Sequence, residues 1–146
     1  MRIAVLNGPN LNLLGTREPA LYGTTTLAEL EARLRAVGAE LGVDVYCAQH
    51  NGEGELINEI HGLRGRADGA LINAGAYSHT SLAIRDAFSE IELPFVEVHL
   101  TNIYAREPER RHSMLAPGAR AVICGFGADG YEWALRGIVA LLAGRE

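Results

Sequence analysis

The sequence predicts an α/β fold in which helices cover both sides of a five-stranded parallel sheet. Two observations support this fold class. Short apolar runs of strand length recur along the chain, and amphipathic segments of helical period stand between them. Parallel neighbours need crossover connections, which these helices supply. A length of 146 residues fits one core, so we expect a single domain over residues 1–146.

The elements alternate regularly. The expected strands are the apolar runs at residues 2–7, 42–48, 67–74, 93–100 and 119–125. Between the first two, leucine and valine recur at three- and four-residue steps over residues 27–41, which predicts an amphipathic helix. Thr25 or Thr26 precedes this stripe and Glu29 follows, so either threonine can cap the helix. Similar stripes predict helices within residues 54–65, 80–91 and 129–144.

Composition and charge exclude several function classes. With 48% hydrophobic and 21% charged residues, the chain can form a packed core. A formal net charge of −5 argues against a nucleic-acid partner. One basic cluster, Arg106, Arg110 and Arg111, is too local to follow a nucleic-acid backbone but can hold a small anion.

The chain also lacks the patterns of membrane, metal and redox proteins. No apolar run approaches the ~20 residues that span a bilayer, so we expect no membrane partner and a cytoplasmic location. Cys47 and Cys124 each end an apolar run, where a buried reduced thiol is the ordinary case. The histidines show no metal-ligand spacing, so we expect no metal.

Polar residues gather after the predicted strands, where parallel sheets bind ligands at their carboxyl edge. The stretch "GTREPALYG", residues 15–23, carries Arg17, Glu18 and Tyr22 between glycines. Tyrosine titrates near ~10 in water, so it acts as a base only where its surroundings favour the phenolate, and a guanidinium does so. Two interpretations are open: a catalytic Arg17–Tyr22 pair, or a solvated loop in which Arg17 pairs with Glu18.

The stretch "INAGAYSHTS" places Asn73 at the end of a buried strand and His79 at the entrance of the next helix. Ser78, Thr80 or Ser81 can cap that helix, whose amides favour an anion. The alternative is that these residues only cap and that His79 is a loop histidine. A hydrolase triad of Ser81, His79 and Asp86 is disfavoured because no G-x-S-x-G nucleophile elbow is present.

In "VEVHLTN", Glu97 and His99 alternate onto one face of a strand that is otherwise apolar. A buried pair of this kind must be partnered. Glutamate beside histidine favours the protonated ring, which makes His99 a candidate general acid. A purely structural Glu–His pair is the alternative.

The run "GFGADG", residues 125–130, matches a dinucleotide-binding pattern. That site also needs a following strand with an acidic residue about twenty positions on. Neither is present in the remaining sequence, so we interpret the run as a strand-to-helix turn.

Five segments taken together closely resemble the type II 3-dehydroquinate dehydratases. They are "LNGPNLNLLGTREPALYG", "NGEGELINEIH", "INAGAYSHTS", "IRDA" and "EVHLTNIYARE", the last followed by "RRHS". The resemblance implies a flavodoxin-like three-layer sandwich. It also implies a lyase that dehydrates 3-dehydroquinate to 3-dehydroshikimate without metal or cofactor, in the shikimate pathway or in quinate breakdown.

The resemblance assigns catalytic roles to residues already singled out. Tyr22 is expected to remove the proton alpha to the ketone, and Arg17 to stabilise its phenolate on a closing lid. Asn10 is expected to hold a water against the enolate oxygen. His99 is expected to protonate the departing hydroxyl while Glu97 orients it.

Substrate contacts are implied for Asn73, His79 and Arg110 and for the backbone of Leu100 and Thr101. Asp86 resembles a residue that family members supply from a neighbouring subunit. The resemblance therefore implies a homo-oligomer, with trimers assembled into a dodecamer.

Other function classes fit less well. A phospho-receiver needs an aspartate where this chain has Asn73, and an acidic pair where it has Asn7 and Asn10. A flavin carrier needs a Ser/Thr-Gly phosphate loop, which "NGPNLNLLG" lacks. A family member that only binds is disfavoured by the joint presence of Arg17, Tyr22 and His99. One departure from the family pattern, Ala74 in place of a proline, is expected to loosen its turn.

Overall fold

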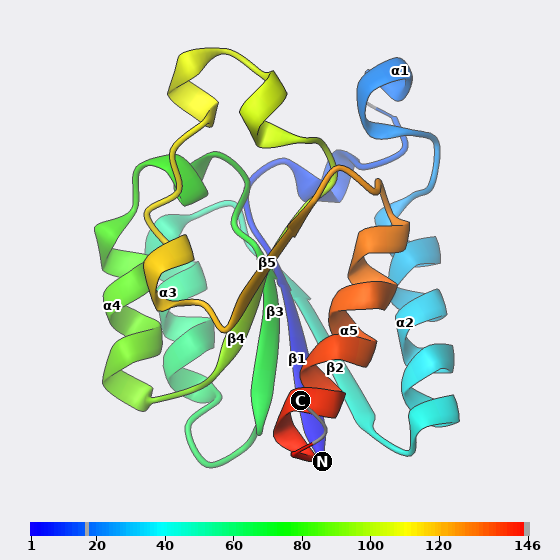
Figure 1. Ribbon diagram of the computed structural model, residues 1–146, viewed down its shortest axis with the longest axis vertical. Helices are drawn as coiled ribbons and strands as arrows, with labels where there is room; N and C mark the ends of the chain where they lie inside the picture. Colours follow the sequence, from blue (N-terminus) through cyan, green and yellow to red (C-terminus); the bar gives the residue numbers. More distant parts are fainter. Residues whose placement is uncertain (17, 145–146) are drawn as a thin grey trace.

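The computed structural model describes residues 1–16 and 18–144. Its centre is a parallel sheet in the order β2-β1-β3-β4-β5 (Figure 1), the flavodoxin-like arrangement. The strands are β1 (Arg2–Asn7), β2 (Asp44–Gln49), β3 (Gly69–Asn73), β4 (Phe95–His99) and β5 (Ala121–Cys124). The predicted fold class and all five strands are confirmed, with ends that shift by about two residues, as is usual for element boundaries.

Helices cover both faces of the sheet. The long helices are α2 (Leu27–Leu41), α3 (Glu53–Gly62), α4 (Leu82–Ile91) and α5 (Asp129–Leu142). In Figure 1, α2 and α5 lie side by side to the right of the sheet and α3 and α4 to its left. This is the three-layer sandwich that the alternating pattern predicted.

The helix boundaries follow from local hydrogen bonding. Thr26 is the N-cap of α2, because its Oγ1 accepts the Glu29 amide at 3.2 Å. Ser81 caps α4 in the same way, accepting the Ile84 amide at 2.9 Å. Of the residues that could cap these two helices, the structure therefore selects Thr26 and Ser81. Gly42 ends α2 in the left-handed conformation.

Each face of the sheet has its own apolar core. On β1, Ile3 and Val5 pack toward α2 and α5, whereas Ala4 and Leu6 pack toward α3 and α4. All four side chains are fully buried. A central strand that is buried on both faces explains why the first apolar run is continuous.

The carboxyl ends of the strands lead into short helices and turns at the top of Figure 1. They comprise η1 (Leu11–Leu13), α1 (Pro19–Tyr22), η2 (Gly75–His79), η3 (Ile103–Ala105) and η4 (Pro108–Arg110). A further short helix, η5 (Ala116–Gly118), precedes β5 and lies lower, to the left of the sheet. The turn after β1 packs directly on the turn after β3, and a Cβ on Gly8 would lie 2.4 Å from the Ala74 carbonyl oxygen. Glycine at position 8 therefore permits the close approach of these two turns.

The remaining glycine-rich run connects β5 to α5. Gly125 and Gly127 have φ values of +96° and +60°, which fit a tight strand-to-helix turn. Within residues 1–16 and 18–144, no helix is long and apolar enough to cross a membrane.

Candidate active site

A pocket lies at the carboxyl ends of β1, β3 and β4, where the sheet topology predicts a ligand. Its lining includes eight of the eleven predicted site residues, namely Asn10, Tyr22, Asn73, His79, His99, Leu100, Thr101 and Arg110. These residues come from five segments that are distant in sequence. The fold thus brings most of the predicted site together.

Three predicted residues do not line this pocket. Glu97 lies directly behind His99, with its side chain fully buried. Asp86 lies on α4, exposed, and borders a different groove that also includes Arg85 and Phe95. Arg17 lies outside the described residues.

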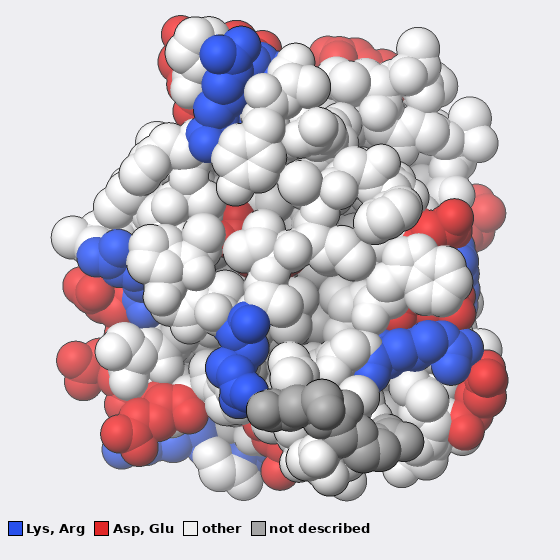
Figure 2. Space-filling model, viewed as in Figure 1, with Lys and Arg blue, Asp and Glu red and all other residues white. Residues whose placement is uncertain are grey.

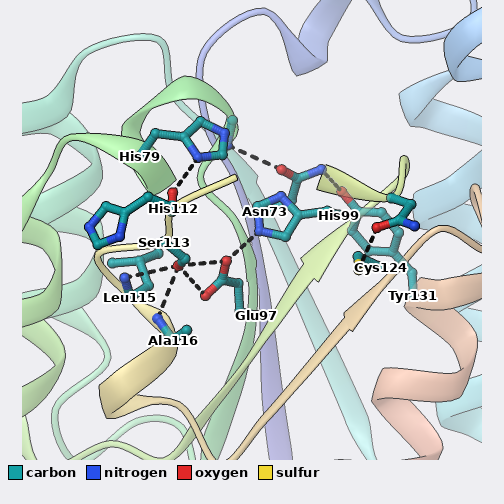
Figure 3. A network of polar contacts seen from close by, with 12 residues as sticks. Asn73, His79, Glu97, His99, His112, Ser113, Leu115, Ala116, Cys124 and Tyr131 are labelled. Atoms are coloured by element: carbon teal, nitrogen blue, oxygen red, sulfur yellow. Dashed lines mark hydrogen bonds and ion pairs between the residues drawn. The ribbon is translucent and has the colours of Figure 1, made fainter. Parts of the chain in front are cut away.

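The acidic side of the pocket is a buried chain of polar contacts (Figure 3). The Glu97 carboxylate contacts His99 Nε2, and Ser113 Oγ donates to both Glu97 oxygens at 2.7 and 2.8 Å. Only 5% of His99 is exposed. Because Nε2 is engaged with Glu97, Nδ1 is the ring nitrogen left to exchange a proton with a bound molecule.

A second histidine lies beside the first. The His79 ring stacks on the His99 ring with 6.1 Å between centroids. His79 Nδ1 donates to the His112 carbonyl oxygen at 2.7 Å, so its proton is on Nδ1 and Nε2 is the acceptor. Burial, more than any other influence, lowers the pKa of His79, which favours this neutral form.

Tyr22 lies at the end of α1 and faces a cation. Arg106 Nη1 donates to the Tyr22 hydroxyl at 3.1 Å, and the guanidinium carbon lies 5.6 Å from the centre of the tyrosine ring. A guanidinium at this distance stabilises negative charge on the phenolic oxygen. The structure thus places a guanidinium donor against the tyrosine hydroxyl in the pocket lining.

A buried triad supports Asn73. Tyr131 Oη donates to Asn7 Oδ1 at 2.6 Å and accepts from Asn73 Nδ2 at 2.9 Å, while Asn73 Oδ1 accepts the Gly75 amide. Burial raises the pKa of Tyr131, so its hydroxyl keeps its proton and the direction of these bonds. The second Nδ2 hydrogen of Asn73 is left for a ligand.

Asn10 occupies an unusual backbone conformation at the pocket mouth. Its φ of 71° is left-handed, which asparagine tolerates better than most residues. The Asn51 side chain, after β2, holds it there, since Asn51 Oδ1 accepts the Asn10 amide at 3.0 Å.

The remaining charged residues near the pocket are arginines of the basic cluster. Arg110, at the end of η4, pairs with Glu107 just before that helix and lines the same pocket as Arg106. On the side of the molecule seen in Figure 2, charged side chains lie in separate small groups and form no continuous basic surface. The basic cluster noted in the sequence therefore contributes two arginines to a single pocket of small-molecule size.

Comparison with known proteins shows the family to which this chain is similar. The family model "Dehydroquinase class II" matches residues 1–139. The 3-dehydroquinate dehydratase of Gemmatimonas aurantiaca is 63% identical over 142 residues, which cover 97% of this chain and 93% of that protein. The crystal structure of type II dehydroquinase from Propionibacterium acnes superposes with a TM-score of 0.91 at 44% identity, covering 95% of this chain and 96% of that chain.

A fungal relative is named differently. "Catabolic 3-dehydroquinase 2" of Aspergillus flavus is 52% identical over 144 residues, which cover 99% of this chain and 96% of that protein. The chain belongs to the class II dehydroquinase family. The match to this family confirms the resemblance that the sequence motifs indicated.

Three contact residues of this dehydroquinase were not predicted. Arg106 was noted only as part of a basic cluster, although it contacts Tyr22. Ser113 ends the "RRHS" segment of the family resemblance, but nothing in that segment relates it to Glu97, 16 residues earlier. Tyr131 carried no sequence signal, because its partner Asn7 lies 124 residues away.

Proposed function

We propose that this chain is a lyase that converts 3-dehydroquinate to 3-dehydroshikimate by anti elimination of water through an enolate. One observation carries the proposal. A tyrosine hydroxyl beside a guanidinium and a histidine backed by a buried carboxylate line the same small pocket. A base and an acid on separate side chains suit a stepwise elimination, in which one group must start unprotonated and the other protonated.

On the base side, the Tyr22 phenolate removes the proton from the carbon alpha to the ketone. Arg106 favours the phenolate through its hydrogen bond to the hydroxyl oxygen. We assign Arg17, by family resemblance, a similar charge-stabilising role. The electrons of the broken C–H bond move onto the ketone oxygen, and a water held by Asn10 stabilises the resulting enolate.

On the acid side, His99 gives a proton to the departing hydroxyl, which leaves as water while the enolate collapses to the conjugated enone. Glu97 orients the ring, since its carboxylate contacts Nε2. The proton taken by Tyr22 and the one given by His99 balance over a full cycle after exchange with solvent.

Binding uses the rest of the lining. We assign Asn73, His79 and Arg110 to the substrate hydroxyls and the backbone after β4, at Leu100 and Thr101, to the carboxylate. The side-chain groups that face the pocket include donors and acceptors, as a polyhydroxylated acid requires.

The sequence also argues against imine chemistry at a side chain. All 13 basic residues counted as lysine or arginine are arginine, so the chain has no lysine amine to form a Schiff base with the ketone. An acid–base elimination needs no such amine and no cofactor.

The finer context rests on the family alone. We place the reaction in the shikimate pathway or in quinate breakdown, and the enzyme in the cytoplasm as one catalytic domain. We also propose trimers assembled into a dodecamer, in which Asp86 approaches the pocket of a neighbouring subunit.

The test is to add 3-dehydroquinate to metal-stripped protein and follow the ultraviolet absorbance of the enone. We expect rapid growth that neither a chelator nor borohydride suppresses. Tyr22→Phe is expected to lower kcat by about 10²- to 10⁴-fold with little change in substrate affinity, because only proton abstraction loses its base. No growth with folded wild-type protein would overturn the proposal and leave a binding protein for cyclic polyol acids.

A further inference from the structure

Ser113 lies in the turn between η4 and η5 and makes four hydrogen bonds through one oxygen. Its Oγ accepts the Leu115 amide at 3.1 Å and the Ala116 amide at 3.0 Å. The same oxygen lies 2.7 and 2.8 Å from the two carboxylate oxygens of Glu97. Figure 3 shows Ser113 at the centre of this network, on the side of Glu97 away from His99.

These contacts fix the direction of the Ser113 proton. A serine hydroxyl has one hydrogen and two lone pairs. The two backbone amides occupy both lone pairs, because an N–H can only donate. The single hydrogen must therefore point at the Glu97 carboxylate.

The consequence falls on Glu97. Its side chain is fully buried, and its oxygens receive hydrogen from Ser113 on one side and from His99 Nε2 on the other. Both contacts hold the carboxylate in one position. Because Ser113 fixes the carboxylate from one side, Glu97 meets His99 in one orientation. A carboxylate oxygen can only accept, so this contact selects the neutral tautomer with hydrogen on Nε2.

We infer that Ser113 is a positioning residue that holds Glu97 as a fixed acceptor and thereby sets the orientation and tautomer of His99. The inference rests on the proposed function only for the role of His99 as proton donor.

The same turn also holds the second pocket histidine. The His112 carbonyl, next to Ser113, accepts the His79 Nδ1 hydrogen at 2.7 Å, and the Met114 amide donates to the Ser78 carbonyl at 2.7 Å. One backbone turn thus orients both stacked rings from outside the pocket. Ser113 acts through Glu97 and is not expected to touch the substrate, since it is absent from the pocket lining.

The decisive variant is Ser113→Ala, with Ser81→Ala as its matched control. Ser81 is a buried serine that also accepts a backbone amide, but its hydrogen bond caps α4. We expect Ser113→Ala to lower kcat on 3-dehydroquinate by about 10- to 100-fold with KM within about twofold, the range for a hydrogen bond to a charged group. Ser81→Ala is expected to keep kcat, and Ser113→Thr, which retains the hydroxyl, to restore most of it.

A spectroscopic measurement tests the inference without any substrate. The ring ¹⁵N shifts of His99, assigned with a His99→Gln variant and recorded in solution alkaline enough to leave the ring neutral, are expected to report one tautomer with Nε2 protonated in the wild type. In Ser113→Ala they are expected to move toward a mixture of both tautomers. If alanine prevents folding, Ser113→Cys replaces it, because a thiol keeps the shape and donates only weakly.

Unchanged His99 shifts and kcat in a folded Ser113→Ala or Ser113→Cys protein would overturn the inference. So would an equal loss of kcat in Ser81→Ala, which would show a general structural effect. An inactive wild type whose His99 shifts still depend on Ser113 would refute the proposed function and leave the positioning role standing.

Discussion

The base side of the pocket depends on two residues that are 84 positions apart, Tyr22 and Arg106. The tyrosine was predicted from its own loop, but the cation that contacts it in the described structure comes from the turn after η3. This separation of base and supporting charge lets each be changed alone. Arg106 can therefore be tested without altering the loop that carries Tyr22.

Arg106→Gln is expected to lower the rate at neutral pH by about tenfold or more, because the phenolate loses a stabilising charge. Initial rates at neutral pH measure the loss. Arg64→Gln, an exposed change at the opposite edge of the sheet, is the control. A rate equal to that of wild type would reduce Arg106 to a packing role.

At the scale of single elements, helix caps and contacts between helices stabilise the fold that positions the site. Helix α2 follows the segment that carries Tyr22, so its start sets where that segment ends. The sequence left Thr25 and Thr26 open as caps, and the hydrogen bond from the Glu29 amide to Thr26 Oγ1 decided between them.

Thr26→Ala is expected to lower the free energy of unfolding by about 1 kcal/mol, the usual loss for an N-cap. Thr25→Ala, one residue earlier, is expected to change it by less than about 0.5 kcal/mol. Urea unfolding of both variants makes the comparison. Equal losses would show that the cap is shared between the two threonines.

Ion pairs also connect helices α2 and α5. Glu132 accepts hydrogen bonds from Arg33 and Arg136. Both bonds lower the pKa of the Glu132 carboxyl, and the bond from Arg33 has the larger effect. A lowered pKa stabilises the folded state at pH values above the ordinary glutamate range, and the gain is lost as pH falls through the lowered value.

Glu132→Gln should therefore destabilise the protein at pH 7, with a difference from wild type that shrinks as pH falls below about 4. Urea unfolding at several pH values measures this difference. Glu90→Gln, an exposed change on α4, should show no such dependence. A difference that stays constant with pH would assign the effect to packing.

At the scale of the whole molecule, Asp86 is the residue that the single chain leaves unexplained. It is exposed on α4 and borders a groove apart from the pocket. If trimers bring it to a neighbour's pocket, each complete site takes Tyr22 from one subunit and Asp86 from the next.

Asp86→Asn and Tyr22→Phe should then each be impaired alone yet complement each other when refolded together. Random mixing in equal amounts is expected to restore about a quarter of wild-type sites, since half the subunits keep Tyr22 and half their neighbours keep Asp86. Steady-state rates of the mixture measure the recovery. Activity no higher than that of the separate variants would refute the shared site.

The sequence by itself determined the fold class, the strands, the four long helices and the residues at the carboxyl edge. These features follow from local periodicity and from the rule that parallel strands point their carboxyl ends to one side. Motifs such as Asn73 to His79 and Glu97 with His99 were visible because each lies within a few residues of a buried strand. They also identified the family.

Only the tertiary structure decided which distant groups touch. Arg106 on Tyr22, Ser113 on Glu97 and Tyr131 between Asn7 and Asn73 are contacts between segments that no periodicity relates. Each depends on how a loop packs at the edge of the sheet. Hydrogen bonds act over about 3 Å, so their partners follow from the packed coordinates and not from spacing along the chain.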